Sequence, residues 1–310
     1  MNGRLWVVVA IASLSSSACR KTEKVRASDS EIVAAESLLT NARASRLEAS
    51  MAASDTGARR DAPIARWPMP TELREISGLT LTADGRLLVH QDQSAIVWEV
   101  DYRRGVLVKR FSLGAKAIKG DFESIAVVGD TVYLFTSKGQ LYAFAEGAND
   151  AHVEYTMIDT GLQPVCEFES MTYEPVSKSL LLACKAPLEP ALADSIVIFK
   201  WKLAGETARG MKLPRLTVPM ARVVGTNAWR SLKPSDITID PFTGNYVLIA
   251  SKAKVIFSIT PKGALVFARA LPPGHEQAEG VAITKDSILL ISDEGQAGQG
   301  QITLYHWPLR

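Results

Sequence analysis

The stretch Gly120-Asp121-Phe122-Glu123-Ser124-Ile125-Ala126 contains a short phrase that occurs five times in the chain. Its second residue is polar, and an aliphatic residue or methionine follows two positions later. The second residues of the five copies are separated by 46, 46, 66 and 44 positions. A repeat of this length indicates an array of similar structural units. The copies are Ile76–Thr80, Phe122–Ala126, Phe168–Thr172, Pro234–Thr238 and Ala278–Ala282.

Each copy is followed by a turn and a second apolar strand that ends in a polar residue. Short strands such as Ser195–Phe199 and Val255–Ile259 fill the space between copies, and no long helical period interrupts them. A period in the forties with four strands in each unit is typical of a propeller blade. We therefore predict an all-β chain folded as a β-propeller of five blades, with six as the alternative. A β-sandwich explains the regular interval less well.

The two ends of the array predict how the ring closes. The last unit contains only three strands before the chain ends, and the strand Ile64–Pro68 precedes the first copy. Pairing that N-terminal strand with the last unit would complete the blade and remove exposed sheet edges. The long interval of 66 residues predicts an insertion of about 20 residues in the third unit, near 186–194 and 203–232.

The phrases Glu75–Thr80, Gly120–Ala126 and Ala278–Ala282 resemble those of the SdiA-regulated family of bacterial β-propellers. More loosely, they resemble the esterase-like phytase propellers. The resemblance covers about residues 63–310. It implies an exported propeller that is attached to a membrane, and it implies little about chemistry.

The N-terminus predicts export. A short basic start is followed by the apolar stretch Leu5–Leu14, by small residues and by Cys19. This pattern resembles a bacterial lipoprotein signal, so we expect residues 1–18 to be a signal peptide and Cys19 to carry a lipid at the cell envelope. In a host with two membranes the periplasmic side of the outer membrane is expected. The alternative is a secretory signal cleaved near Ala18, which leaves Cys19 as a free thiol.

Residues 19–62 are rich in Ala, Ser, Arg and Glu, and we expect a partly helical or disordered tether before the propeller at 63–310. A helix docked on the propeller is the less favoured alternative. The composition, with 22% charged residues and a net charge of +2, shows no concentrated basic face and argues against nucleic acid as a partner.

The remaining cysteines, Cys166 and Cys184, form an even pair in a chain that we expect in an oxidising compartment. Their positions on neighbouring strands of the third blade favour a disulfide. Two free thiols are the alternative.

Two columns of residues converge on one mouth of the predicted channel. The second residues of the phrases form the first column, and the ends of the second strands form the other. Glu123 and Glu169 each fall beside a lysine, which predicts ion pairs at the rim. The columns are Ser77, Glu123, Glu169, Ser235 and Glu279, and Asp92, Lys138, Lys185, Lys252 and Asp293.

Circular closure places the first and last blades side by side, so Asp92, Glu279 and Asp293 would crowd one sector. Crowded carboxylates bind a cation, share protons or point into water. We predict a hard-cation site there, most plausibly for Ca²⁺. Opposite it, Lys138, Lys185, Lys252 and His275 would bind an anionic group, and His275 could act as an acid or base. Solvated or paired rim charges without a ligand are the alternative.

These features predict a binding module at the cell envelope that recognises a small anion, a glycan or a protein through the channel mouth. The alternative is a Ca²⁺-dependent phosphoesterase. The sequence contains no His-x-x-x-His, Cys-x-x-Cys or Gly-x-Ser-x-Gly motif, which argues against a zinc site and a serine hydrolase of that type.

Overall fold

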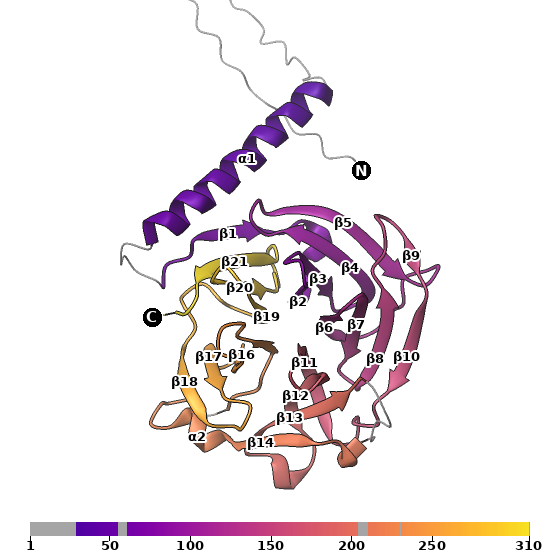
Figure 1. Cartoon of the computed structure of the whole chain (residues 1–310), viewed down its shortest axis with the longest axis vertical. Coiled ribbons are helices and arrows are strands. Elements are labelled where there is room, and N and C mark those ends of the chain that lie inside the picture. Colours follow the sequence, from indigo (N-terminus) through magenta and orange to yellow (C-terminus); the bar gives the residue numbers. More distant parts are fainter. Residues whose placement is uncertain (1–28, 55–60, 204–209, 230, 310) are drawn as a thin grey trace, which may run out of the picture.

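Five β-sheets stand radially around a central channel, and each forms one blade of a propeller (Figure 1). The computed structural model describes residues 29–54, 61–203, 210–229 and 231–309. The innermost strands of neighbouring blades contact one another all the way round the ring. The prediction of a five-bladed propeller is therefore confirmed.

Blade 1 gains a fifth, outer strand from the chain segment that connects the last two strands of blade 2. Blade 1 contains β2 (Ile76–Leu81), β3 (Leu87–Gln91), β4 (Ser94–Asp101), β5 (Val106–Leu113) and the short parallel strand β9 (His152–Val153). Blade 2 contains β6 (Phe122–Val128), β7 (Thr131–Thr136), β8 (Gln140–Ala145) and β10 (Tyr155–Asp159).

The other three blades have four strands each. Blade 3 contains β11 (Cys166–Glu174), β12 (Ser179–Pro187), β13 (Ser195–Lys202) and β14 (Arg215–Pro219). Blade 4 contains β15 (Asp236–Ile239), β16 (Tyr246–Ala250), β17 (Val255–Ile259) and β18 (Leu265–Ala270). Blade 5 contains β19 (Ala278–Ile283), β20 (Ile288–Asp293), β21 (Gln301–His306) and β1 (Ala65–Pro68).

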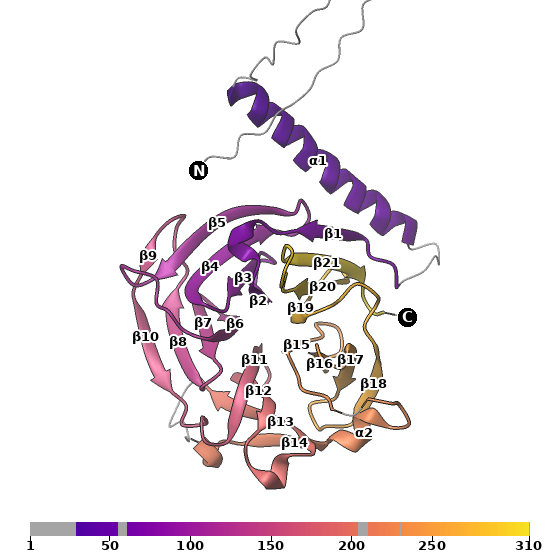
Figure 2. The ribbon, with the colours of Figure 1, turned by 180° about the vertical axis from the view of Figure 1, so that it is seen from behind.

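Blade 5 closes the ring by joining the two ends of the propeller (Figure 2). Strand β1 pairs antiparallel with β21, with Arg66 opposite Thr303 and Trp67 opposite Ile302. The Trp67 indole Nε1 donates a hydrogen bond of 2.7 Å to the Tyr102 carbonyl in blade 1. The predicted closing strand is thus confirmed, and it also fastens blade 5 to its neighbour.

The extra residues of blade 3 lie in its connections. The 3₁₀ helix η2 (Pro190–Leu192) lies between β12 and β13, η3 (Gly210–Lys212) lies before β14, and α2 (Met220–Val224) follows β14. The 3₁₀ helix η1 (Thr71–Leu73) connects β1 to β2. The insertion therefore lengthens loops of one blade and adds no sheet.

The core lies between the blades, where the sheets pack face to face. Phe168 contacts Phe135 of blade 2 with ring centroids 5.1 Å apart, and Phe199 of its own blade at 6.1 Å. All three rings are fully buried. Truncating a ring in such a position to alanine typically costs about 3–5 kcal/mol of unfolding free energy. The ring of blades is therefore rigid enough to fix side chains around the channel.

Helix α1 (Asp29–Ser54) precedes the propeller and docks through its C-terminal half. Leu47 is 1% exposed in the core cluster of blades 1 and 5, and Met51 packs against the same cluster. The Arg43 guanidinium lies 5.6 Å from the ring of Trp67. The structure thus favours the docked helix over a free tether for this segment. No helix in the described part of the chain is long and apolar enough to span a membrane.

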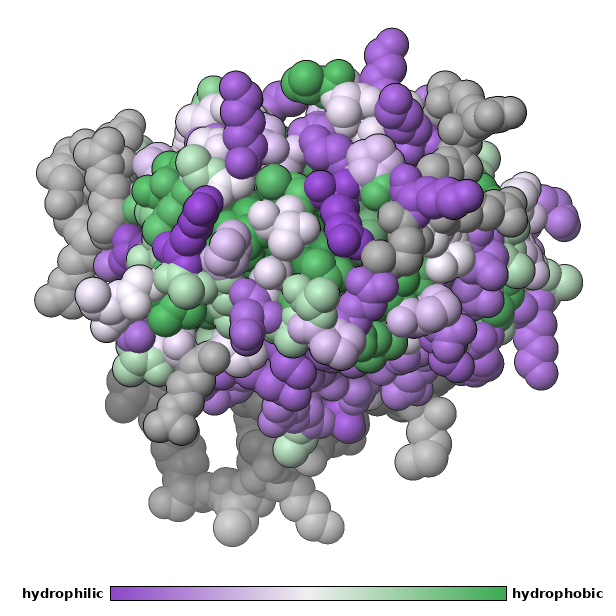
Figure 3. Space-filling model, turned by 90° about the horizontal axis from the view of Figure 1, so that it is seen from below, coloured by the Kyte–Doolittle hydropathy of each residue, from purple (hydrophilic) through white to green (hydrophobic). Residues whose placement is uncertain are grey.

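The edge of the propeller disc has a mixed surface. In an edge-on view, hydrophobic side chains are interrupted by hydrophilic ones, with no continuous apolar band across the face that is shown (Figure 3). The two ends of the channel, in contrast, each hold a cavity.

Candidate functional site

An acidic cavity of about 140 Å³ lies at the channel end where the inner strands begin. Seven of its nine lining residues are carboxylic acids, and the other two are Ser77 and Gln277. We call these nine residues the acidic mouth. The acids are Glu75, Asp92, Asp121, Glu123, Glu169, Glu279 and Glu294.

A repeated β-bulge turns side chains into this cavity. In blades 1, 2, 3 and 5 the register between the first two strands skips one residue of the inner strand. A bulged residue has no direct partner, and its side chain is redirected away from the regular alternation. In all four blades it is the predicted first-column residue, and all four line the cavity: Ser77, Glu123, Glu169 and Glu279.

Blade 4 lacks this feature. Strand β15 begins at Asp236, and the residue before it, Ser235, is 2% exposed. The Ser235 hydroxyl donates a hydrogen bond of 2.7 Å to the Ala278 carbonyl, and Asp236 Oδ2 accepts one of 2.7 Å from Val281 N–H. Burial raises the pKa of Asp236 well above its ordinary value. Blade 4 therefore uses its polar residues to join blade 5 and leaves the acidic mouth to the other four blades.

Asp92 is the member of the second column that lines the cavity. It follows β3, and its carbonyl accepts a hydrogen bond of 2.8 Å from Phe122 N–H of blade 2. Its side-chain oxygen Oδ1 is buried and has no hydrogen-bond partner among the described residues. Burial and the charge of Glu75 raise its pKa. An oxygen in this situation is available to a ligand.

Four lining residues were missed as site candidates: Glu75, Asp121, Gln277 and Glu294. Three of them stand two positions before a bulged residue, directly before the first residue of an inner strand. This spacing was visible in the phrases, so the sequence carried the signal. Glu294 follows the end of β20, and its N–H donates a hydrogen bond of 3.0 Å to the Gln277 carbonyl.

Burial and mutual repulsion raise the pKa values of the acids at this mouth. The pKa of Glu123 is raised to about 8, first by burial and then by the charge of Asp121. Burial raises the pKa of Glu279 to about 7. The pKa of Glu294 is also raised to about 7, by burial and by its hydrogen bond with Glu75. Several of these groups therefore hold protons near neutral pH when no cation balances them.

The predicted lysines occupy different positions. Lys185 pairs with Glu169, as predicted, and also lies 3.4 Å from Glu167. Lys138 and Lys252 are exposed and do not line the cavity. Lys138 was expected to pair with Glu123, whose side chain instead faces other acids. The mouth is thus dominated by negative charge, and the predicted lysine-lined anion site is not assembled in this cavity.

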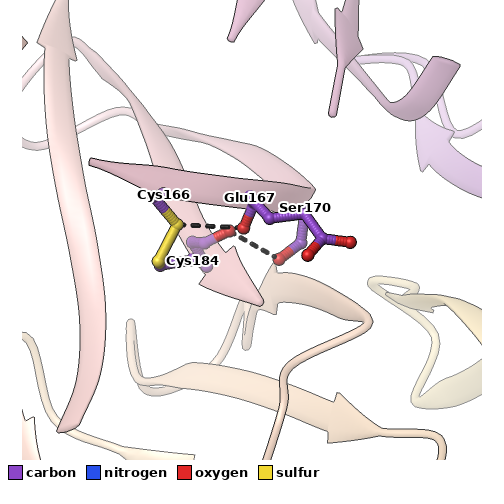
Figure 4. Close-up of a disulfide and its surroundings, with 5 residues drawn as sticks. Cys166, Glu167, Ser170 and Cys184 are labelled. Carbon is purple, nitrogen blue, oxygen red and sulfur yellow. Dashed lines mark hydrogen bonds between the residues drawn. A yellow bond between two sulfur atoms is a disulfide. The ribbon is translucent and has the colours of Figure 1, made fainter. Parts of the chain in front are cut away.

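The disulfide Cys166–Cys184 lies beside this mouth and links β11 to β12 (Figure 4). The two Cα atoms are 5.8 Å apart. Cys184 directly precedes Lys185. In the pairing of β11 with β12, Lys185 has no partner, because Glu167 pairs with Ala186 and Phe168 pairs with Cys184. The bridge therefore fixes the irregular segment that places Glu169 and Lys185.

His275 and Asp293 form a separate buried pair. His275 Nδ1 donates a hydrogen bond of 2.6 Å to Asp293 Oδ2, and its Nε2 lies 2.8 Å from the Tyr305 hydroxyl. His275 and Asp293 are each 2% exposed. His275, which we expected among the anion-binding residues of the channel mouth, is thus buried against blade 5 and does not line the cavity.

Asp293 does not line the acidic mouth, so the predicted trio of Asp92, Glu279 and Asp293 is not assembled around the cavity. Its charge still contributes to the raised pKa of Glu279. Within the described ranges, no three His, Cys, Asp or Glu side chains are placed as ligands of one metal ion.

Comparison with solved structures confirms the architecture. The glutaminyl cyclase of Myxococcus xanthus matches with a TM-score of 0.50 and 12% identity, over 78% of this chain and 94% of that protein. The PQQ-bound aldose sugar dehydrogenase of Streptomyces coelicolor also has a TM-score of 0.50, at 14% identity, over 79% and 99% of the two chains. No protein-family model and no curated protein sequence matches. At these identities the likeness shows that the chain has the β-propeller fold and does not assign an activity.

Proposed function

We propose that the protein is an exported, lipid-anchored propeller that binds a cationic ligand at the acidic mouth, with Ca²⁺ as the first ion to test. The observation that carries this proposal is the convergence of seven carboxylic acids on one small cavity. The lipoprotein signal with Cys19 and the resemblance to the SdiA-regulated family support a place at the cell envelope. Both of these arguments rest on the sequence.

The electrostatics of the mouth favour a cation. Glu123 and Glu279 hold protons near neutral pH because burial and nearby charges raise their pKa values. A bound cation would replace those protons and remove the repulsion. Carboxylate oxygens are the donors that Ca²⁺ prefers. Asp92 Oδ1, which is buried and unpartnered, would be one of them.

The acids are not arranged as a finished metal cage, so an ion must draw side chains together as it binds. The long side chains of Glu123, Glu279 and Glu294 can make this adjustment. Competition with protons would weaken binding at low pH, and the side-chain movement would lower the affinity at any pH. A small anion, glycan or protein would then contact the mouth through the bound cation or through the exposed Lys138 and Lys252.

Calorimetric titration of the purified protein with Ca²⁺ tests the proposal, at pH 7 in two buffers of different ionisation heat. We expect saturable binding with proton release. Glu123→Gln should weaken the affinity at least ~tenfold, because it removes one charge from a partly desolvated site. Glu276→Gln is the matched control, since Glu276 is exposed and pairs with Lys254 outside the cavity.

An organic dication such as putrescine, titrated under the same conditions, separates a metal site from a general cation site. Putrescine binding without Ca²⁺ binding would support a general cation site and reject a metal site. Saturable binding of neither cation would contradict the proposal.

A Ca²⁺-dependent phosphoesterase is the second candidate. The observation in its favour is that the mouth holds more carboxylates than the sequence columns predicted. This candidate predicts that the protein hydrolyses p-nitrophenyl phosphate only when Ca²⁺ is present, and that Asp92→Asn abolishes the hydrolysis. Calcium binding without hydrolysis would reject this candidate and keep the binding module.

A further inference from the structure

A second cavity, of about 360 Å³, lies at the opposite end of the channel, where the inner strands finish. All five inner strands contribute to it, through Leu79, Val127, Met171, Ile237 and Val281. No charged side chain lines it among the described residues. We call this cavity the apolar mouth, and it is independent of the acidic mouth discussed above.

Four threonines give this cavity a limited polar character, and the Thr82 hydroxyl among them is already bonded to Asp84. The other three are alike. Thr80, Thr172 and Thr238 occupy the last position of their phrases, and all three line the cavity half-buried. Their side-chain hydroxyls make no hydrogen bond to any described residue. The equivalent positions in the other two blades hold Ala126 and Ala282, so the hydroxyl groups belong to blades 1, 3 and 4.

The rim of the cavity is also apolar on the side of blades 3 and 4. Pro175 and Pro241 line the cavity at the turns that follow β11 and β15. The next residues, Val176 and Phe242, are 96% and 56% exposed. The apolar surface therefore continues from the cavity onto the outer face of the disc.

We propose that the apolar mouth binds a small uncharged molecule that is mostly apolar and carries a hydroxyl or carbonyl group. The cavity volume falls within the range of ~300–1,000 Å³ typical of small-ligand sites. An uncharged ligand enters without the cost of stripping water from an ion. The threonine hydroxyls can hydrogen-bond its polar group and orient it. Because the lining belongs to the packed inner strands, the site is already formed before binding.

Titration with octan-1-ol tests the proposal, because this molecule has an apolar chain and one hydroxyl. The readout is the ¹³C-methyl NMR signal of Met171, which lines the cavity, with Met69 and Met157 as internal references outside it. We expect a saturable shift of the Met171 signal alone. Octanoate, which has an apolar chain of the same length and a charge, should bind at least ~tenfold more weakly.

Paired variants locate the effect. Thr172→Glu places a charge in the cavity and should weaken octan-1-ol binding at least ~tenfold, whereas Thr156→Glu, on the exposed outer strand β10, should not change it. If Thr172→Glu does not fold, Thr238→Val removes a hydroxyl with little change of shape and should weaken binding ~3–10-fold. An unmoved Met171 signal, equal binding of octanoate, or equal effects of the two glutamates would each overturn the proposal.

Discussion

The two ends of the channel share the inner strands of four blades, yet one end gathers carboxylic acids and the other is lined by no charged side chain among the described residues. At the acidic mouth each of four inner strands begins with a bulge, and the bulge aims a polar residue into the cavity. A few residues later the strand is regular and presents aliphatic residues and threonines. The comparison shows that one bulged residue in each of four blades is enough to give the two ends of the same channel different chemistry.

Loss of the disulfide should have the largest effect on stability and should affect the acidic mouth alone. In Cys166→Ser/Cys184→Ser we expect the free energy of unfolding to fall by ~3 kcal/mol, because the bridge closes a short loop. Cation affinity should fall as well, since Glu169 and Lys185 lose their fixed position. Urea unfolding measures the stability, and a reducing agent added to the unmodified protein should reproduce it. Octan-1-ol binding should not change in the folded variant.

The acidic mouth should make stability depend on pH. Glu123 and Glu279 have folded-state pKa values of about 8 and about 7, above the ordinary 4.5. Between pH 4.5 and 8 the folded state therefore binds more protons than the unfolded state, so the free energy of unfolding falls as pH rises. We expect this loss between pH 5 and pH 8.5, the range that spans both raised pKa values.

Urea titrations at several pH values, without added cation, measure this slope. Glu123→Gln should flatten it, because that side chain no longer titrates. A stability that rises from pH 5 to pH 8.5 would show that these acids are ionised in the folded protein.

Gly78 lies between the two mouths, and a side chain there should disturb both. A Cβ atom at this position would lie 2.6 Å from His90 Nε2 and 3.4 Å from the Ser124 Cα atom. We expect Gly78→Ala to lower the unfolding free energy by ~1–2 kcal/mol, because β2 must move away from its neighbours. Thermal unfolding measures the loss, and cation and octan-1-ol titrations should both weaken. A change at one mouth alone would show that the two ends are less closely coupled than the shared strands imply.

The smallest effect should come from the rim of the apolar mouth. Val176→Ser removes an apolar side chain that is 96% exposed. The unfolding free energy should change by less than ~0.5 kcal/mol, as for most surface substitutions. The dissociation constant for octan-1-ol should rise by no more than ~twofold, because the rim adds little buried area. A larger loss of binding would move the centre of the site from the cavity to the rim.

The sequence was sufficient to predict the architecture because the repeat interval can be read directly from the order of the residues. The phrase interval predicted five blades, and the bounds of β17 agree with the predicted strand Val255–Ile259. The same repeat also identified the first-column residues, which the bulges turn into the acidic mouth in four blades. The Cys166–Cys184 pairing followed from placing both residues on adjacent strands of one blade.

The sequence was insufficient to predict outcomes that depend on one residue of strand register or on contacts between distant segments. The sequence columns aligned Asp293 with Asp92, but Asp293 pairs with Ala278 as Gln91 pairs with Ile76, so Asp293 is the counterpart of Gln91. It hydrogen-bonds to His275 and is buried with it. Docking of α1 was also hidden, because Leu47 is an isolated apolar contact in a helix without a continuous apolar stripe. Such outcomes depend on tertiary neighbours far away in the chain, which a local pattern does not encode.

The pairing of β1 with β21 has a consequence for how the chain is made. The partners Ala65 and Leu304 lie in the first and last strands of the propeller, so the ring cannot close until β21 has been made. A copy that stops early leaves β1 without a partner and blade 5 with an open edge, which exposes it to proteases and to pairing with other chains. Ring closure therefore depends on synthesis reaching β21, because only then is β1 paired.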